Sequence, residues 1–236
     1  LNEESAIAKN CYWINKDSDI KYIDLFSGAG GLSLGLEKNG FNHALSVDFD
    51  KDSIDTYRFN RPHIDPKTIL LDDMVSLTDD KWSEWKHLVG KIDLIAGGPP
   101  CQGFSTANRR RLIDDPRNEL YKKFIGTVDI FKPKVVIMEN VVGILNKNDE
   151  IRKDFQKIGY FGQSVKLSAK AFGIPQNRVR VFFIMVSDMF RYDKQITMIS
   201  EICNKLSIHN NNESDFVLLD AISDMPEIKT NPERNN

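Results

Sequence analysis

The sequence predicts an α/β fold with a largely parallel central sheet, and two observations support it. Short apolar runs of strand length alternate with longer helical patterns, which is the order of βα units. A thiol and two carboxylates follow directly after three of these runs, where the crevice of an open α/β sheet lies. At 236 residues and 41% apolar residues, the chain can bury such a core without disulfides.

The first predicted unit begins at residue 21. Residues 22–26 form an apolar strand, residues 27–31 a glycine-rich loop, and the leucines that follow mark a helix ending at Gly40. A strand, a glycine loop and a helix in this order are typical of a nucleotide-type cofactor site. The loop lacks the full G-x-G-x-x-G pattern, which argues against NAD.

The second predicted strand, residues 43–47, ends at an acidic residue. Asp48 lies 17 positions after Gly31, close to the offset of roughly 20 residues at which an acidic side chain accepts ribose hydroxyls in dinucleotide folds. The sequence therefore favours a ribose-binding role for Asp48.

The rest of the chain continues the alternation. Further strands are expected at 68–71, 91–96, 134–138, 164–168 and 180–186, and helices at 51–59, 119–131 and 195–206. Residues 1–20 are expected to form a polar arm, 207–216 a loop, and 231–236 a frayed end.

Composition narrows the class of protein. Lys+Arg 32 against Asp+Glu 34 gives a net charge of −2, so any contact with nucleic acid must come from a local basic surface. Three widely spaced cysteines argue for a reducing compartment, and the four histidines show no metal-ligand spacing, so no metal is expected. No stretch approaches the length of a membrane span, and the start is not a signal peptide, so we expect a soluble intracellular protein.

One cysteine stands at a turn fixed by glycine and proline. Gly97-Gly98-Pro99-Pro100 separates the apolar run 92–96 from Cys101. Glycines permit close backbone approach and prolines stiffen the turn, so the thiol can be aimed at a substrate in the crevice. The alternative is that Cys101 is a buried small hydrophobe, the usual fate of a free cysteine.

Two further sets of charged residues are candidates for chemistry. Glu139 follows the strand 135–137 and either caps the next helix or acts as a general acid beside Cys101. Arg178 and Arg180 enter an apolar strand on one face, as a surface salt-bridge pair or as planar donors to a substrate. The triplet Arg109–Arg111 is a solvated surface or a set of phosphate contacts.

Taken together, three motifs spread over residues 21–186 resemble those of the bacterial DNA (cytosine-5) methyltransferases. They are Asp24-Leu25-Phe26-Ser27-Gly28-Ala29-Gly30-Gly31, Pro99-Pro100-Cys101-Gln102-Gly103-Phe104-Ser105, and Glu139-Asn140-Val141 with the later Gln176-x-Arg178-x-Arg180. The resemblance implies a class I S-adenosylmethionine-dependent (Rossmann-like) fold, with S-adenosylhomocysteine as product and no metal. Residues 21–206 would be the catalytic domain.

The resemblance also implies a set of cofactor-binding residues. Asp48 would bind the ribose, Phe49 would stack on adenine, and Asp72 and Asp73 would contact the adenine edge. The full set is Phe26, Ser27, Gly28, Ala29, Gly30, Gly31, Asp48, Phe49, Asp72, Asp73, Pro99 and Leu120.

The implied substrate is cytosine flipped out of duplex DNA, because C5 and C6 cannot be approached inside the stack. Cys101 would add at C6, Glu139 would hold N3, and Arg178 and Arg180 would hold the base and its backbone. The implied setting is a restriction-modification system in the bacterial cytoplasm, in association with the nucleoid when acting.

The chain departs from the family pattern at its end. Residues 207–236 are expected to be a linker towards a target-recognition domain that this sequence does not contain, so the chain would be a fragment or one subunit of a split enzyme with a second polypeptide. Two alternatives remain open: an RNA cytosine-5 methyltransferase, and a non-catalytic S-adenosylmethionine-binding subunit of a larger complex.

Overall fold

The computed structural model describes residues 19–100 and 120–210, together with residues 217 and 223. The expected nucleophile Cys101 and the triplet Arg109–Arg111 lie outside the described residues. So do nearly all of the expected arm, residues 211–216 of the expected loop, and residues 231–236.

A seven-stranded sheet runs through the described part of the chain, in the order β3-β2-β1-β4-β5-β7-β6. All pairs among the first five strands of the chain are parallel, whereas β7 is antiparallel to both of its neighbours, β5 and β6. This confirms the α/β class and the mostly parallel sheet. The strands are β1 (Lys21–Leu25), β2 (Asn42–Asp48), β3 (Ile69–Leu71), β4 (Leu94–Gly97), β5 (Val135–Asn140), β6 (Tyr160–Ser168) and β7 (Val179–Ser187).

The strand order reverses between β1 and β4. From β1 the chain proceeds outward through β2 and β3, and it then returns to β4 on the other side of β1. Ligands of open α/β sheets bind at such a switch point, outside the carboxyl ends of the strands. The segments that follow β1, β2, β4 and β5 therefore meet at the edge where a site is expected.

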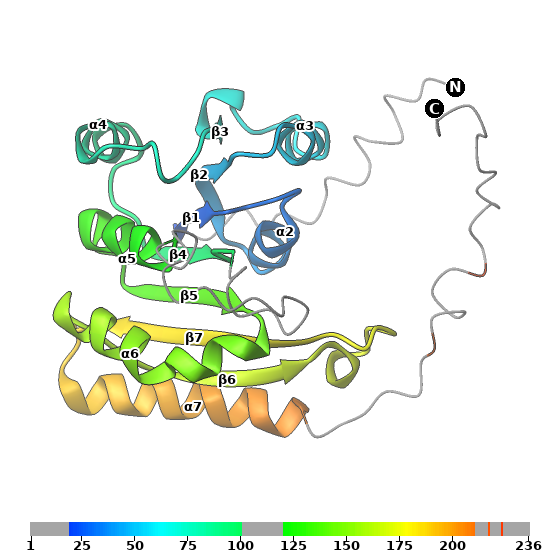
Figure 1. The fold of residues 1–236 in the computed structure, drawn as a ribbon, viewed down its shortest axis with the longest axis vertical. Coiled ribbons are helices and arrows are strands. Elements are labelled where there is room, and N and C mark those ends of the chain that lie inside the picture. Colours follow the sequence, from blue (N-terminus) through cyan, green and yellow to red (C-terminus); the bar gives the residue numbers. More distant parts are fainter. Residues whose placement is uncertain (1–18, 101–119, 211–216, 218–222, 224–236) are drawn as a thin grey trace.

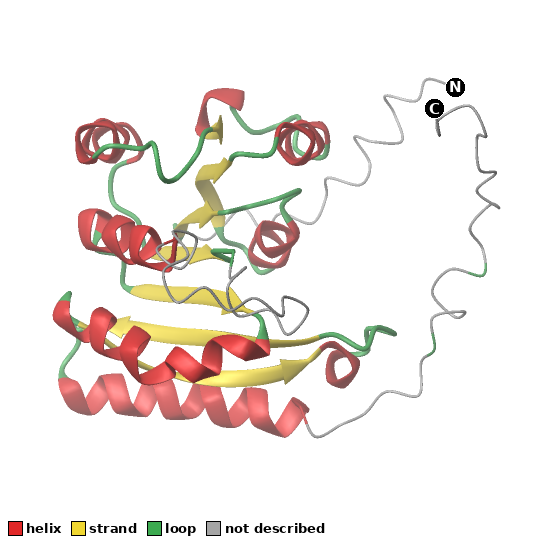
Figure 2. Cartoon of the chain, in the orientation of Figure 1, coloured by secondary structure: helices red, strands yellow, loops and turns green. Residues whose placement is uncertain are grey.

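Helices cover both faces of the sheet (Figures 1 and 2): α2 and α3 lie on one side of β1 and β2, and α4 and α5 on the other. Helices α6 and α7 pack against β6. The helices are α2 (Gly31–Lys38), α3 (Lys51–Phe59), α4 (Asp79–Val89), α5 (Leu120–Phe131), α6 (Asn148–Lys157) and α7 (Tyr192–Asn210), with 3₁₀ turns η1 (Pro66–Thr68), η3 (Val142–Lys147) and η4 (Ala169–Phe172).

Strand β1 shows how the core divides between the two faces. Alternate residues of a strand point to opposite sides. Ile23 and Leu25 are fully buried in the cluster that includes the apolar residues of α4, α5 and α6. Tyr22 packs in a second cluster with Leu36 of α2, and Asp24 lies on that same side because Ser33 of α2 donates to it.

Several predicted boundaries are wrong for local reasons. Residue Phe26 was expected to end the first strand, but it has φ 58, in the left-handed region, and β1 ends one residue earlier. The helix expected to end at Gly40 ends at Lys38, and Gly40 (φ 83) reverses the chain into β2. Residues 207–210, expected in a loop, continue α7.

Other strands and helices differ in extent. The strand expected from residue 91 begins at Leu94, and the one expected from Thr68 begins at Ile69, because residues 66–68 form a 3₁₀ turn. Strand β6 begins at Tyr160 instead of residue 164 because it pairs with β7 along its whole length. Helices α4 and α6 were not expected: two buried apolar side chains on each, such as Trp82 and Val89 of α4, give a weak pattern.

Among the helices that the structure describes, none combines the length and the apolar composition needed to cross a membrane.

Candidate cofactor and base site

The glycine-rich loop follows β1 at the switch point of the sheet. Gly28 has φ 54 and Gly30 has φ 86, values that favour glycine. The Ser27 amide donates to the Val47 carbonyl (3.0 Å), which holds the loop against the end of β2. A Cβ placed on Gly28 or Gly31 would meet no atom within 4 Å, so these two positions present bare backbone to open space.

Asp48, the last residue of β2, is bonded to two loops at once. Its Oδ2 accepts the Gly28 amide at 2.8 Å, and its Oδ1 accepts the Asp50 amide at 2.9 Å. Asp48 is 9% exposed. Because each carboxylate oxygen can accept more than one hydrogen bond, these contacts leave acceptor capacity for a ligand.

A cavity of about 230 Å³ opens beside this loop. Six of the residues expected to bind a cofactor line it, from segments far apart in sequence: Phe26, Asp48, Phe49, Asp72, Asp73 and Leu120. Phe49 is 68% exposed, which leaves an aromatic face available for stacking. The other six expected residues are not in the lining: Ser27, Gly28, Ala29, Gly30, Gly31 and Pro99.

Three lining residues were missed by sequence reasoning: Met74, Val75 and Pro100. Met74 and Val75 directly follow Asp72 and Asp73. Two apolar residues after an acidic pair at the end of a strand are a sequence pattern that could have indicated the apolar part of the lining. Pro100 is the immediate neighbour of Pro99, the proline that the resemblance indicates.

The acidic pair itself is held in place by local bonds. Asp72 pairs with Lys81 of α4 and accepts from the Ser76 hydroxyl, while Asp73 accepts the Val75 amide at 2.9 Å. Burial raises the pKa of Asp72, but the hydrogen bond and charge of Lys81 outweigh it, so the pKa lies below its usual value. Asp72 is therefore a carboxylate at neutral pH.

The turn that leads to Cys101 is fixed against two neighbouring strands. A Cβ on Gly97 would lie 2.1 Å from the Leu25 carbonyl oxygen, and one on Gly98 would lie 3.0 Å from Glu139 Oε2. The Asn140 side-chain amide donates to the Pro99 carbonyl at 2.9 Å. The expected nucleophile thus follows a segment that is held at the ends of β1 and β5, although Cys101 itself lies outside the described residues.

Glu139 and the two expected arginines come together. Arg180 Nε lies 2.9 Å from Glu139 Oε1, and Arg178 Nη2 lies 3.7 Å from the same oxygen. The topology explains the contact: β7 runs antiparallel to β5, so its first residues lie beside the last residues of β5. Arg180 is the second residue of β7, and Arg178 directly precedes this strand.

The exposure of these three side chains differs. Those of Glu139 and Arg180 are 25% and 26% exposed, and that of Arg178 is 50% exposed. In the structure the two arginines therefore form ion pairs, as one of the two interpretations of the sequence expects. Their partner is Glu139, at the edge of the sheet where a substrate is expected, and not an unrelated acid on the surface.

The chemistry of the loop fits S-adenosylmethionine. Ser27 Oγ is buried and has no hydrogen-bond partner in the described part of the chain, and bare backbone at Gly28 and Gly31 leaves room beside it. A buried hydroxyl without a partner is costly, so a polar group of a ligand would satisfy it. Within the described ranges, no group of three or more His, Cys, Asp and Glu side chains is arranged to hold a metal ion.

The whole described chain is similar to one protein family. A family model described as C-5 cytosine-specific DNA methylase matches residues 20–236. A curated relative, Type II methyltransferase M1.HphI of Haemophilus parahaemolyticus, is 43% identical over 173 residues, which are 70% of this chain and 45% of that protein. Type II methyltransferase M.DdeI of Desulfomicrobium norvegicum is 37% identical over 217 residues, which are 88% of this chain and 48% of that protein.

A solved structure gives the same result. The crystal structure of a protein described as a DNA modification methyltransferase encoded within a prophage (E. coli) superposes with a TM-score of 0.61 at 35% identity, over 72% of this chain and 47% of that one. The chain spans about half the length of the curated relatives it matches.

Proposed function

This chain belongs to the C-5 cytosine-specific DNA methylase family, and from that premise we propose that it transfers a methyl group from S-adenosylmethionine to C5 of cytosine in duplex DNA. One observation carries the proposal. The turn that leads to Cys101 is bonded to Asn140 and lies against Glu139, and its last described residue, Pro100, lines the same cavity as Asp48 and Phe49.

The proposed residue roles follow from what cytosine chemistry requires. C5 is a poor nucleophile, and addition of the Cys101 thiolate at C6 breaks the aromatic system and makes C5 enamine-like. Electron density then moves onto N3, where Glu139 holds a proton. S-adenosylmethionine, when bound, supplies an electrophilic methyl group. Loss of the C5 proton expels the Cys101 thiolate and restores the ring.

The arginines are proposed to hold the base. Arg180 and Arg178 offer planar, permanently charged donors that suit the base carbonyl O2 and the adjoining phosphate. In the structure both reach Glu139 Oε1, so a bound base would share or take over these donors. The other carboxylate oxygen, Oε2, is the one that faces Gly98 and the turn to Cys101.

The cofactor is proposed to lie in the cavity beside the glycine loop. Ser27, Gly28 and Gly31 would meet its polar groups, Asp48 its ribose, and Phe49 its adenine. Asp72 and Asp73 would contact the adenine edge, and Leu120 would complete the apolar wall. Six of the expected residues share this cavity although they come from four separate stretches of the chain, which supports the assignment.

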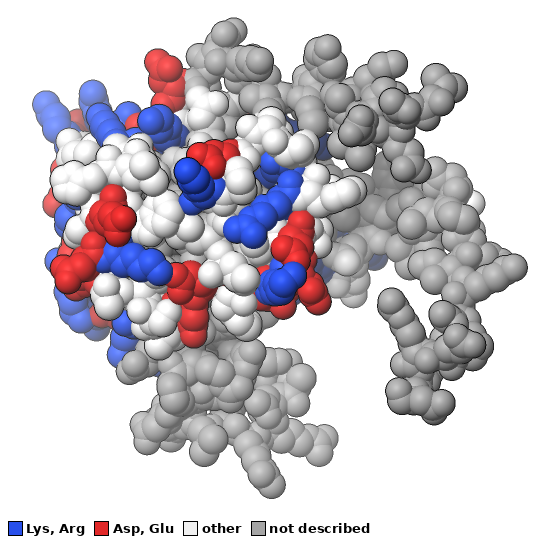
Figure 3. Space-filling view, turned by 90° about the horizontal axis from the view of Figure 1, so that it is seen from above, with Lys and Arg blue, Asp and Glu red and all other residues white. Residues whose placement is uncertain are grey.

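Duplex DNA is the proposed substrate, in a restriction-modification setting such as the names of the relatives indicate. The face over α3 and α4 is a poor candidate for DNA, because Lys and Arg are interspersed there with Asp and Glu (Figure 3). Arg178 and Arg180, at the start of β7 in the other half of the sheet, are basic residues that form ion pairs with Glu139.

Recognition of a target sequence is proposed to involve protein outside these 236 residues, either a continuation of the chain or a second polypeptide. The relatives are about twice as long as the part matched, which supports the idea. Methylation of a defined site by the 236 residues alone would contradict it.

The proposed reaction is tested with tritium-labelled S-adenosylmethionine. After incubation with the labelled cofactor, the duplex DNA is digested to nucleosides, and the label is expected in 5-methylcytosine. RNA of the same sequence serves as the second arm: label in RNA alone would favour the RNA methyltransferase alternative. Cofactor binding without label in either substrate, even when the polypeptide that carries the recognition domain is added, would favour a non-catalytic subunit.

A further inference from the structure

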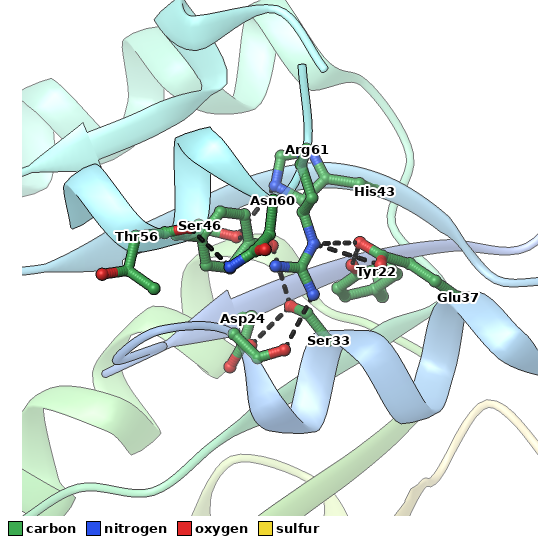
Figure 4. A network of polar contacts seen from close by, with 11 residues as sticks. Tyr22, Asp24, Ser33, Glu37, His43, Ser46, Thr56, Asn60 and Arg61 are labelled. Carbon is green, nitrogen blue, oxygen red and sulfur yellow. Dashed lines mark hydrogen bonds and ion pairs between the residues drawn. The ribbon is translucent and has the colours of Figure 1, made fainter. Parts of the chain in front are cut away.

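We propose that Arg61 is a positioning residue for the cofactor loop: its buried guanidinium fixes the carbonyl of Gly30 and thereby the conformation of residues 27–31. The inference rests on the proposed cofactor site, and nothing in the sequence motifs points to Arg61. Arg61 lies two residues after α3, and its side chain reaches back between α3 and α2 (Figure 4).

The guanidinium makes three contacts at once. Its Nε donates to both carboxylate oxygens of Glu37 in α2, at 2.8 and 3.1 Å. Its Nη2 donates to the Gly30 carbonyl at 2.8 Å, and its central carbon lies 4.1 Å from the centre of the Tyr57 ring. Arg61 is 4% exposed and Glu37 is 8% exposed, so water does not compete for these donors.

Gly30 is the point where the loop becomes a helix. Its carbonyl also accepts the Leu34 amide (2.9 Å), the first hydrogen bond of α2, and its own amide donates to the Ser27 carbonyl (3.0 Å). No side chain caps α2, so Arg61 supplies from a distant segment a fixed contact at the helix start. A shift of the guanidinium therefore moves both the loop backbone and the first turn of α2.

The fit around Gly30 is tight. A Cβ at this position would lie 2.5 Å from Arg61 Nη1 and 2.6 Å from the Tyr57 ring. The side of Gly30 that faces α3 is thus filled, whereas Gly28 and Gly31 are open on the cavity side. The loop is held from behind by Arg61 and Tyr57 while its bare backbone stays free for a ligand.

An arginine is needed for this arrangement, not just a positive charge. The planar guanidinium presents donors in a fixed fork, so one group can pair with Glu37 and donate to Gly30 together. A lysine ammonium could neutralise Glu37, but it lacks the planar fork that donates to Glu37 and to the Gly30 carbonyl in fixed directions. For stability alone, an apolar side chain would serve as well, since buried ion pairs often add little.

The test separates loop positioning from stability. Arg61→Met alone leaves the buried Glu37 without its charged partner, so the informative variant is the double change Arg61→Met with Glu37→Gln, which removes both charges. Arg61→Lys is the second variant, and Lys51→Met, an exposed ion pair on α3, is the matched control. The melting temperature is measured without ligand, and Kd for S-adenosylmethionine and S-adenosylhomocysteine by calorimetry.

The double variant is expected to melt close to the wild type yet bind both ligands about 10-fold or more weakly, the loss expected for a charged donor at a backbone carbonyl. KM for the cofactor should rise while kcat at saturating cofactor changes little. Arg61→Lys should also bind weakly, and Lys51→Met should bind normally.

Wild-type Kd in a folded double variant, or in Arg61→Lys if the double variant does not fold, would overturn the role of Arg61. Failure of the wild-type protein to bind either ligand would instead overturn the proposed cofactor site. The two failures are therefore distinguishable.

Discussion

Asp24 is a buried carboxyl group near the end of β1, close to the cofactor loop. Burial raises its pKa from 3.8 to about 7, although the Ser33 hydroxyl at Oδ2 and the charge of Arg61 oppose the shift, and the charge of Glu37 adds to it. Its Oδ1 is buried and has no partner among the described residues. The carboxyl is therefore accommodated best when it carries a proton.

We expect Asp24→Asn to remove a pH dependence from stability. A raised folded-state pKa means that the folded protein binds more protons than the unfolded chain between about pH 4 and 7, so stability is present below this window and is lost as pH rises through it. The free energy of unfolding of the wild type should fall by about 1.4 kcal/mol per pH unit relative to Asp24→Asn. Urea unfolding of both proteins from pH 5 to 8 measures it, and parallel curves would rule the effect out.

The Asp48 carboxylate holds the backbone of the neighbouring loops, and it is also proposed to bind the ribose of the cofactor. Because it accepts the amides of Gly28 and Asp50, Asp48→Ala should weaken S-adenosylmethionine binding by about 1–3 kcal/mol, through both the lost ribose contact and a looser loop. Calorimetry measures the change, with the exposed Asp52→Ala as control. Unchanged affinity would mean that Asp48 serves only to end its strand.

At the scale of elements, the end of β5 holds the turn that precedes the proposed nucleophile. Asn140 is 4% exposed, its amide donates to the Pro99 carbonyl, and its Oδ1 accepts the Val141 amide at 2.8 Å. The motif Glu139-Asn140-Val141 thus joins a proposed base-binding carboxylate to a structural bond that positions the neighbouring segment.

We expect Asn140→Ala to lower kcat by about 10-fold or more while changing the cofactor Kd less. The substitution frees the Pro99 carbonyl and the Val141 amide, and one or more kcal/mol of lost positioning corresponds to such a factor. Single-turnover kinetics and calorimetry measure the two quantities. The control is Asn39→Ala, an exposed amide that donates to the Gly35 carbonyl. An equal loss in Kd and kcat would point to general destabilisation.

The elements that the sequence located best are those with a strong period or a turn signal. The strands β1, β2, β5 and β7 and the glycine loop follow from apolar runs that end at glycine or polar residues. Helices α4 and α6 were missed because each buries two apolar side chains against the sheet, too few for a clear helical pattern. The predicted end of α7 was wrong because three of the four residues 207–210 are polar, yet these residues extend an established helix.

At the scale of the whole molecule, the sheet order creates the site. Segments after β1, β2, β3 and β4 meet in one cavity because their strands are parallel, and the antiparallel insertion of β7 brings Arg180 to Glu139. The resemblance of the motifs indicated Glu139, Arg178 and Arg180 but did not predict which side chains they contact. The pairing of the arginines with Glu139, the bond from Asn140 to Pro99 and the role of Arg61 depend on three-dimensional neighbours that no spacing in the sequence encodes.

The central claim is that Cys101 attacks a cytosine held beside Glu139. Duplex DNA that contains 5-fluorocytosine tests it directly, because fluorine at C5 cannot leave as a proton does and the adduct at C6 persists after methyl transfer. With S-adenosylmethionine present, the account predicts a denaturation-resistant complex of protein and DNA, with the DNA attached to Cys101 in the peptide mass spectrum. Cys101→Ser should bind the cofactor and form no complex. Absence of the complex in a wild-type protein that binds cofactor and DNA, or its formation by Cys101→Ser, would contradict the account.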